Sequence, residues 1–294
     1  LPIMEQLFAN ILFSSSTIFI VGISFSLIFS TARFFHFAHA AVITSGAYLF
    51  FACSQLGAIP VSLSVIFALI ASAGIGWCLE LAAYRQMRHK GASPLILLLA
   101  SLGLYILLQN GISMLFGDDT KVISGANVAS TFTFFEAKMT LIQIVVVGFA
   151  GFILIAKIFI IDKTRIGLAL RAVANSPDLA EVSGIEFDKT MGIAFCLGSF
   201  LAGCAGLSRA FDVGMTPTMG LPMLLLGVVA VILGGMDKTF GIAIASILLA
   251  SFQEISGWHF GTQWEEAIAF LLLLSFLIFR PQGLFGRALK NTTV

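Results

Sequence analysis

Residues 94–116 read PLILLLASLGLYILLQNGISMLF, a run without a single charged side chain. This length and apolarity match the ~20 residues with which an α-helix crosses a bilayer. In lipid every backbone amide must be paired within the structure, so only helices or a closed barrel remain. Barrel strands alternate apolar and polar residues, whereas this run is continuous. The stretch therefore predicts a transmembrane helix.

The composition of the whole chain agrees with this prediction. Of the 294 residues, 59% are hydrophobic and 11% are charged, and the mean hydropathy is +1.03. A soluble domain carries about 25% charged residues, so this chain lacks the surface to be one. The net charge of +1 gives no electrostatic basis for binding nucleic acid. No nucleophile–base pair or metal-ligand set is evident, so we expect a membrane protein that is not an enzyme.

Apolar runs recur along the chain and predict an all-α membrane protein, a single transmembrane domain over 1–294 with about eight or nine helices. The predicted spans are 10–31, 36–56, 59–83, 94–116, 140–161, 189–210, 221–235, 239–256 and 265–280. The short span 221–235 is bounded by Pro222 and Gly234-Gly235, and 36–56 is interrupted by Thr44-Ser45-Gly46. Both fit a half-helix that enters the membrane without crossing it.

The distribution of Lys and Arg predicts the orientation in the membrane. With nine crossings and an outside N-terminus, 13 of the 16 fall on inner loops: Arg33, Arg85, Arg88, Lys90, Lys157, Lys163, Arg165, Arg171, Lys189, Lys238, Arg280, Arg287 and Lys290. The outer loops carry only Lys121, Lys138 and Arg209. Because cytoplasmic loops are enriched in Lys and Arg, we expect a multi-pass protein with its C-terminus in the cytoplasm.

The inner loop 162–188 carries its own helix signals. Residues 165–175 are rich in Ala and Leu, which favours a helix. Ser176-Pro177-Asp178 is a helix start, with a capping side chain, a proline at the first position and an acid in the first turn. Gly184 is a stop signal. Together these residues predict a short helix over 177–183.

The predicted short helix places Leu179 and Val182 on one face, flanked by Asp178 and Glu181. An apolar face with charged edges suits docking into the groove of a partner protein. A solvated helix that packs on the membrane surface has the same pattern. The residues alone leave both interpretations open.

Four blocks of sequence together resemble a known family. The loop 162–188 is similar to the cytoplasmic coupling loop of permeases in bacterial ABC importers of the branched-chain amino acid type. The block 35–39 (FHFAH) with 46–48 (GAY) resembles the early N-F-A-H-G-E … G-A-Y segment of these permeases. The block 217–222 (PTMGLP) with Gly234-Gly235 resembles their late helix entry, and 280–286 (RPQGLFG) resembles their C-terminal ending. The similarity runs nearly end to end, with His36 in place of the Asn and Ala40-Ala41 in place of the Gly-Glu.

The resemblance implies a permease subunit in the bacterial inner membrane that works with a second, homologous permease. Two ATP-binding subunits would dock beneath the pair, and a periplasmic solute-binding protein would deliver a small-molecule solute. That solute would be a branched-chain or other neutral amino acid, or alternatively urea or a short amide. The chain contains no Gly-Lys dipeptide and therefore no phosphate-binding loop of that kind. We expect no cofactor on this chain, with ATP and Mg on the partner ATPases.

The resemblance also assigns ATPase coupling to residues of the inner loop: Arg165, Gly167, Arg171, Asn175, Pro177, Asp178, Leu179, Glu181, Val182 and Gly184. A self-contained channel or secondary carrier is the alternative from another class. A carrier would need intramembrane acids or an inverted repeat, and mid-span acids are few. A capped inner helix also has no evident purpose in a channel.

Polar side chains inside the predicted spans are candidates for the solute path, because such groups are costly in lipid. They are His36, His39, Thr44, Gln109, Asn110 and Glu254. For Gln109 and Asn110 the alternative is a hydrogen bond between helices, and for Glu254 it is a place on the outer rim. His36 and His39 have a spacing that fits two metal ligands on a helix, but no third ligand is evident and we expect no metal.

Two further features of the spans predict packing contacts. Glu80, near the inner end of span 59–83, is expected to form an ion pair with Arg85 or Arg88. Gly198, Gly203 and Gly206 in span 189–210 permit a close approach of another helix. That contact would lie within the chain or at the seam with the second permease.

Overall fold

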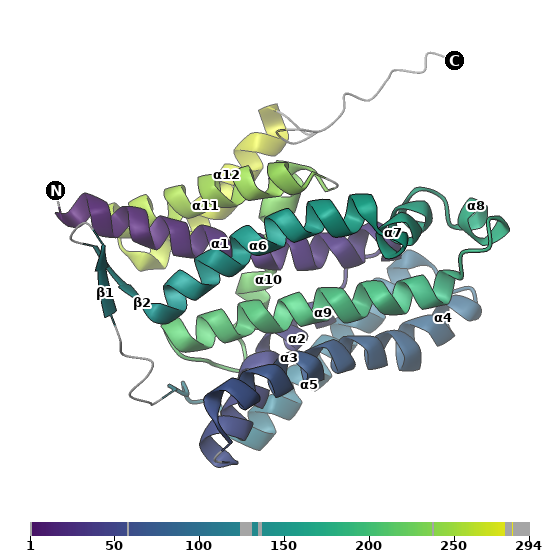
Figure 1. Cartoon of the computed structure of the whole chain (residues 1–294), viewed down its shortest axis with the longest axis horizontal. Coiled ribbons are helices and arrows are strands. Elements are labelled where there is room, and N and C mark those ends of the chain that lie inside the picture. Colours follow the sequence, from purple (N-terminus) through teal and green to yellow (C-terminus); the bar gives the residue numbers. More distant parts are fainter. Residues whose placement is uncertain are drawn as a thin grey trace.

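The computed structural model describes residues 2–57, 59–123, 131–134, 137–236, 238–279 and Leu284, and these are almost entirely helical (Figure 1). The longer helices are α1 (Pro2–Ala32), α3 (Val61–Leu79), α5 (Pro94–Phe116), α6 (Leu141–Lys163), α9 (Phe187–Asp212) and α11 (Thr239–Phe260). The shorter ones are α2 (Ala38–Phe51), α4 (Arg85–His89), α7 (Arg165–Asn175), α8 (Pro177–Val182), α10 (Gly220–Gly234) and α12 (Glu265–Phe279). Two strands, β1 (Thr131–Phe134) and β2 (Ala137–Thr140), form an antiparallel hairpin.

Each of the nine predicted spans contains a helix, and the all-α polytopic membrane fold is confirmed. Among the described residues, six helices are long and apolar enough to cross a bilayer, and two shorter apolar helices accompany them. α10 has 15 residues, which rise only ~22 Å at 1.5 Å each, against a hydrocarbon core of ~30 Å. Its length agrees with the predicted half-helix.

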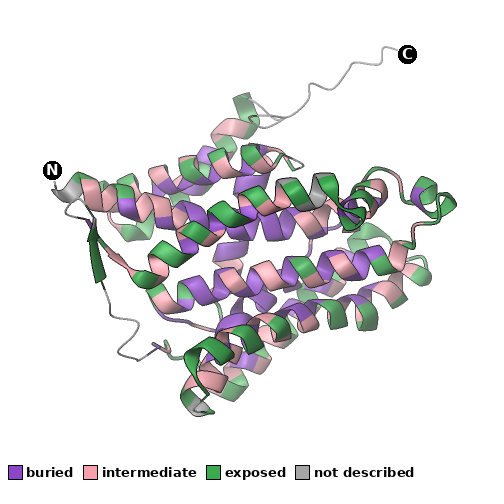
Figure 2. Ribbon diagram, viewed as in Figure 1, coloured by how far each residue is buried: buried purple, intermediate pink, exposed green. Residues whose placement is uncertain are grey.

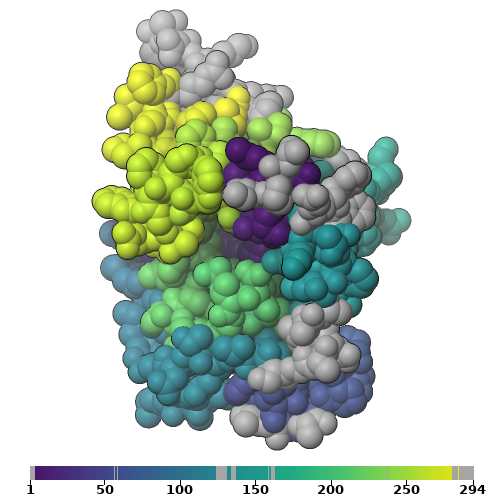
Figure 3. Space-filling view, turned by 90° about the vertical axis from the view of Figure 1, so that its left-hand side faces the viewer, coloured from purple at the N-terminus to yellow at the C-terminus, as the bar shows by residue number. Residues whose placement is uncertain are grey.

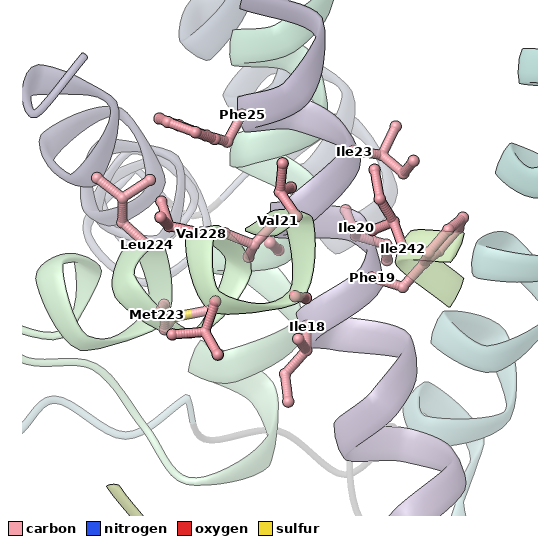
Figure 4. Close-up of a cluster of buried hydrophobic side chains, with 14 of the residues drawn as sticks. Ile18, Phe19, Ile20, Val21, Ile23, Phe25, Met223, Leu224, Val228 and Ile242 are labelled. Carbon is pink, nitrogen blue, oxygen red and sulfur yellow. The ribbon is translucent and has the colours of Figure 1, made fainter. Parts of the chain in front are cut away.

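α10 runs across the long helices instead of alongside them. Figure 4 shows the crossing, where Met223, Leu224 and Val228 of α10 pack against the part of α1 that carries Ile18 and Val21. The two helices come close at Gly227: a Cβ added there would lie only 2.4 Å from the Val21 side chain. A glycine at this crossing therefore allows a contact that any larger residue would push apart.

α2 is the most enclosed helix, as the buried purple centre of the ribbon indicates (Figure 2). Twelve of its 14 residues are buried. A Cβ on Gly206 of α9 would lie 2.0 Å from the carbonyl oxygen of Ile43, and one on Gly220 of α10 would lie 2.0 Å from that of Ala40. The backbones of α9 and α10 thus touch the backbone of α2 directly.

The prediction of close packing at the three glycines of α9 is confirmed, but the alternative of a seam with a second permease is wrong for them. Gly198 faces Ile28 and Ser24 of α1, and Gly203 faces Ser72 of α3. Together with the contact of Gly206 on α2, all three approaches lie inside the chain. The outer surface is formed instead by large apolar side chains, such as Leu107 of α5 and Phe279 of α12.

At one end of the bundle, the hairpin β1–β2 lies beside the start of α1 (Figure 1). The side chain of Gln6 donates to the carbonyl oxygen of Lys138 at 3.2 Å and accepts from its backbone N–H at 2.9 Å. The hairpin lies between the predicted spans 94–116 and 140–161, apart from its last residue. We call this end, with α1's start and the hairpin, the hairpin end.

At the opposite end, which we call the α8 end, ion pairs join α4 to the first turn of α9. Arg88 donates to Glu80 through both terminal nitrogens, one of them at 3.0 Å, so the predicted ion pair forms with Arg88. Arg85 pairs with Asp188 at 2.9 Å, and His89 also reaches Asp188. Glu80 is 2% exposed. A carboxylate buried to this extent needs the positive charge of Arg88 beside it to offset the free energy lost on leaving water.

Candidate functional site

α7 lies at the α8 end and is held against the bundle by one face. Thr164 caps it by accepting from the backbone N–H of Gly167 at 3.1 Å. Gly167, Leu170 and Val173 are buried, and their spacing of three puts them on one side of the helix. The guanidinium of Arg33, which follows α1, donates to the carbonyl oxygen of Ala174. α7 is therefore a fixed platform, with the predicted coupling residues Arg165, Arg171 and Asn175 on its exposed face.

α8 projects from this platform (Figure 1). Ser176 caps it by accepting from the N–H of Leu179 at 3.5 Å, and Gly184, with a φ of +80°, follows its end. The predicted helix 177–183 is confirmed, with observed bounds of Pro177–Val182. Ala180 faces inward and is buried.

The opposite face of α8 is apolar and open. Leu179 is 68% exposed and Val182 87% exposed, and the charged side chains of Asp178 and Glu181 flank them, also exposed. Exposed apolar side chains on a short, doubly bounded helix outside the bundle form a compact knob. The geometry thus has the shape predicted for a docking element.

Three candidate path residues lie in the enclosed centre of the chain. His36 precedes α2, and its Nδ1 lies 3.0 Å from the Tyr84 hydroxyl, whereas Nε2 of His39 lies 2.9 Å from Ser24. The two rings are neighbours, with centroids 5.7 Å apart. Thr44 is buried and its hydroxyl donates to the carbonyl oxygen of Ala40. Among the described residues, no group of three His, Cys, Asp or Glu side chains is arranged to hold a metal.

The structure separates the other path candidates. Gln109 and Asn110 lie on α5, most of which faces outward, and Asn110 is exposed, with its side-chain amide donating to Ile106 of the same helix. Glu254 lies instead at the hairpin end, where it accepts from the Ser14 hydroxyl at 2.6 Å. The six candidates therefore do not form one site.

Glu254 lines a cavity of about 330 Å³ at the hairpin end. Figure 3 looks onto this end, where α1 (purple), the segment from α9 to α10 (green) and α11–α12 (yellow) come together. The cavity is lined from all of them, by residues that include Ser14, Ile18, Arg209, Met223 and Glu265. The sequence places Arg209 on an outer loop and makes Glu254 a path candidate, but no local signal in the chain links these two residues to each other or to Glu265.

These features define a class of protein. A helical membrane bundle with a capped apolar knob at one end and a charged cavity at the other has the parts of a transport permease. No solved structure matches the chain significantly. Comparison with known sequences is decisive: residues 7–277 match the family described as branched-chain amino acid transport system, permease component. The chain belongs to this family.

Curated relatives match over nearly their full length. The high-affinity branched-chain amino acid transport system permease protein BraD of Pseudomonas aeruginosa is 28% identical, over 97% of this chain and 96% of the relative. The LivH permease protein of the corresponding Escherichia coli system is 26% identical, with the same coverage. A probable branched-chain amino acid transport permease of Methanocaldococcus jannaschii is 25% identical, over 92% of this chain and 89% of the relative.

Proposed function

We propose that this chain is the membrane-spanning permease subunit of an ABC importer for branched-chain amino acids in the bacterial inner membrane. The observation that carries the proposal is the exposed knob of Leu179 and Val182 on α8, in a chain of the permease family. Val182 is 87% exposed, so it has few contacts within its own chain. It gains a role when a partner covers it.

The partner at α8 is an ATPase subunit, and each of two such subunits binds ATP and Mg for the importer. Docking buries Leu179 and Val182, while Asp178, Glu181 and Arg171 lie at the rim, where charges set specificity more than affinity. A second, homologous permease completes the path, and a periplasmic binding protein delivers the amino acid. The α8 end then faces the cytoplasm and the hairpin end the periplasm.

The positive-inside rule, applied to the two ends of the bundle, supports the proposed orientation. Arg33, Arg85 and Arg88 form their contacts at the α8 end. The hairpin end carries Lys121, Lys138 and Arg209: the backbone of Lys121 pairs with that of Met215, Lys138 bonds Gln6, and Arg209 lines the cavity. The α8 end also carries Lys163, Arg165 and Arg171 on or beside α7, and this richer positive charge supports a cytoplasmic location.

Reconstitution tests the proposal. Vesicles that contain this chain, its partner permease and the ATPases should accumulate leucine when ATP is inside and loaded binding protein is outside. Vesicles with this chain alone should not concentrate leucine, because the energy source is on the partners. Active accumulation by the lone chain would show a secondary carrier instead. Accumulation of urea or a short amide in preference to leucine would show that the substrate is not a branched-chain amino acid.

A further inference from the structure

The cavity at the hairpin end has an uneven distribution of charge that points to its occupant. Arg209 is the one cation among the described residues that line it. Among the described residues Arg209 forms no ion pair within 4 Å. A guanidinium offers five donors in a planar fork that matches a carboxylate. The charges of Arg209 and Glu265 still interact across the cavity, so the guanidinium lies beside a carboxylate and has further donors for an anionic group that enters.

The start of α10 adds no free donor to this part of the wall. Met219, which precedes the helix, and Pro222 in its first turn both line the cavity. Proline has no N–H, and the N–H of Met219 donates to the carbonyl oxygen of Thr216 at 3.2 Å. Arg209 alone therefore gives this part of the wall the chemistry of a carboxylate site.

The wall formed by α11 and α12 has the opposite charge. Glu254, Glu265 and Glu266 all line the cavity, and Asp212 of α9 adds a fourth carboxylate on the side of Arg209. The hydroxyl of Ser14 donates to Oε1 of Glu254. The Glu265 side chain packs against α11 about one turn further along, where a Cβ on Gly257 would lie 2.4 Å from Oε1 of Glu265. Oxygens from two or three carboxylates suit the three donors of an ammonium group.

The lining also has an apolar part, with Ile18, Met223 and Leu226 among its residues. A volume of about 330 Å³ lies at the small end of the range for ligand pockets. We propose that this cavity is the entry site for the transported solute and binds a zwitterionic α-amino acid. Its carboxylate lies at Arg209, its ammonium at Glu254 and Glu265, and its apolar side chain against Ile18 and Met223.

This proposal rests on the proposed function, so its test measures two quantities in one reconstituted importer. These are the leucine delivered and the ATP hydrolysed in response to loaded binding protein. Arg209→Gln and Glu254→Gln should each lower the leucine delivered per ATP roughly ten-fold or more, because each removes one charge-assisted contact. The matched controls Lys138→Gln and Asp119→Asn change exposed charges at the same end that do not line the cavity. They should stay within about two-fold of the parent.

The outcomes separate the two proposals. If the parent importer does not accumulate leucine, the proposed function fails before the cavity is tested. If it does, and the cavity variants deliver as much leucine per ATP as the controls, the entry site is refuted. Loss with Glu254→Gln but not with Arg209→Gln would also overturn the zwitterion assignment, because it indicates a purely cationic occupant.

A labelling experiment covers the case in which the charge variants fail to assemble. Thr17 lines the cavity from α1, and Thr17→Cys introduces a thiol there without changing any charge. Saturating leucine-loaded binding protein should slow its alkylation several-fold, whereas a cysteine at Lys138 should react at the same rate with and without solute. Equal protection at both positions, or at neither, contradicts an entry site in the cavity.

Discussion

Replacement of Leu179 by Asp is the sharpest test of the knob on α8. The Leu179 side chain is 68% exposed in the chain, and full burial of a leucine is worth ~1.5–3 kcal/mol. Docking that covers this surface therefore contributes roughly 1–2 kcal/mol. An unpaired carboxylate in the same apolar contact adds a desolvation cost of at least ~2 kcal/mol. The sum, ~3 kcal/mol or more, weakens ATPase binding more than about a hundred-fold.

The assay is co-purification of the ATPase subunits with the tagged permease, together with ATP hydrolysis in response to loaded binding protein. Leu179→Met keeps an apolar side chain of similar volume and should cost less than ~1.5 kcal/mol. Ser183→Asp places the same charge at the end of α8 without removing the knob, and should retain the ATPases. Membrane insertion should survive in all three, because α8 lies outside the spans. Leu179→Asp complexes that assemble and transport at the parent level would refute the reasoning.

Two further predictions concern the bundle itself. Gly206→Ala should lower the free energy of unfolding in detergent by about 1–3 kcal/mol or more, because its Cβ would lie 2.0 Å from the Ile43 carbonyl oxygen. The control Gly103→Ala has nothing within 4 Å of its Cβ and should be neutral or slightly stabilising. Equal effects of the two substitutions would contradict the observed packing of α9 on α2. The positive-inside rule predicts that a cysteine at Lys163 is shielded from an impermeant thiol reagent in intact cells, whereas one at Lys121 reacts. Labelling of position 163 from outside would show that the orientation is the reverse of the one proposed.

The sequence by itself determined the helices and the ends of the coupling segment. Length and apolarity are enough to mark a membrane span, because the bilayer sets the length and forbids unpaired backbone. The bounds of α8 were also predictable, because a capping Ser176, Pro177 at the first helical position and Gly184 after the end act within a few residues. The predicted C-terminal block 280–286 lies outside the described residues apart from Leu284.

Only the tertiary structure decided which faces of these helices meet each other. In a soluble helix an apolar stripe marks the buried side, but lipid is as apolar as leucine, so a membrane helix carries little such signal. The sequence therefore could not show that Asn110 faces outward or that the glycines of α9 pack within the chain instead of against a second permease. It also could not bring Arg209 to the same cavity as Glu254 and Glu265, because residues from α9, α11 and α12 meet there only after the bundle has formed.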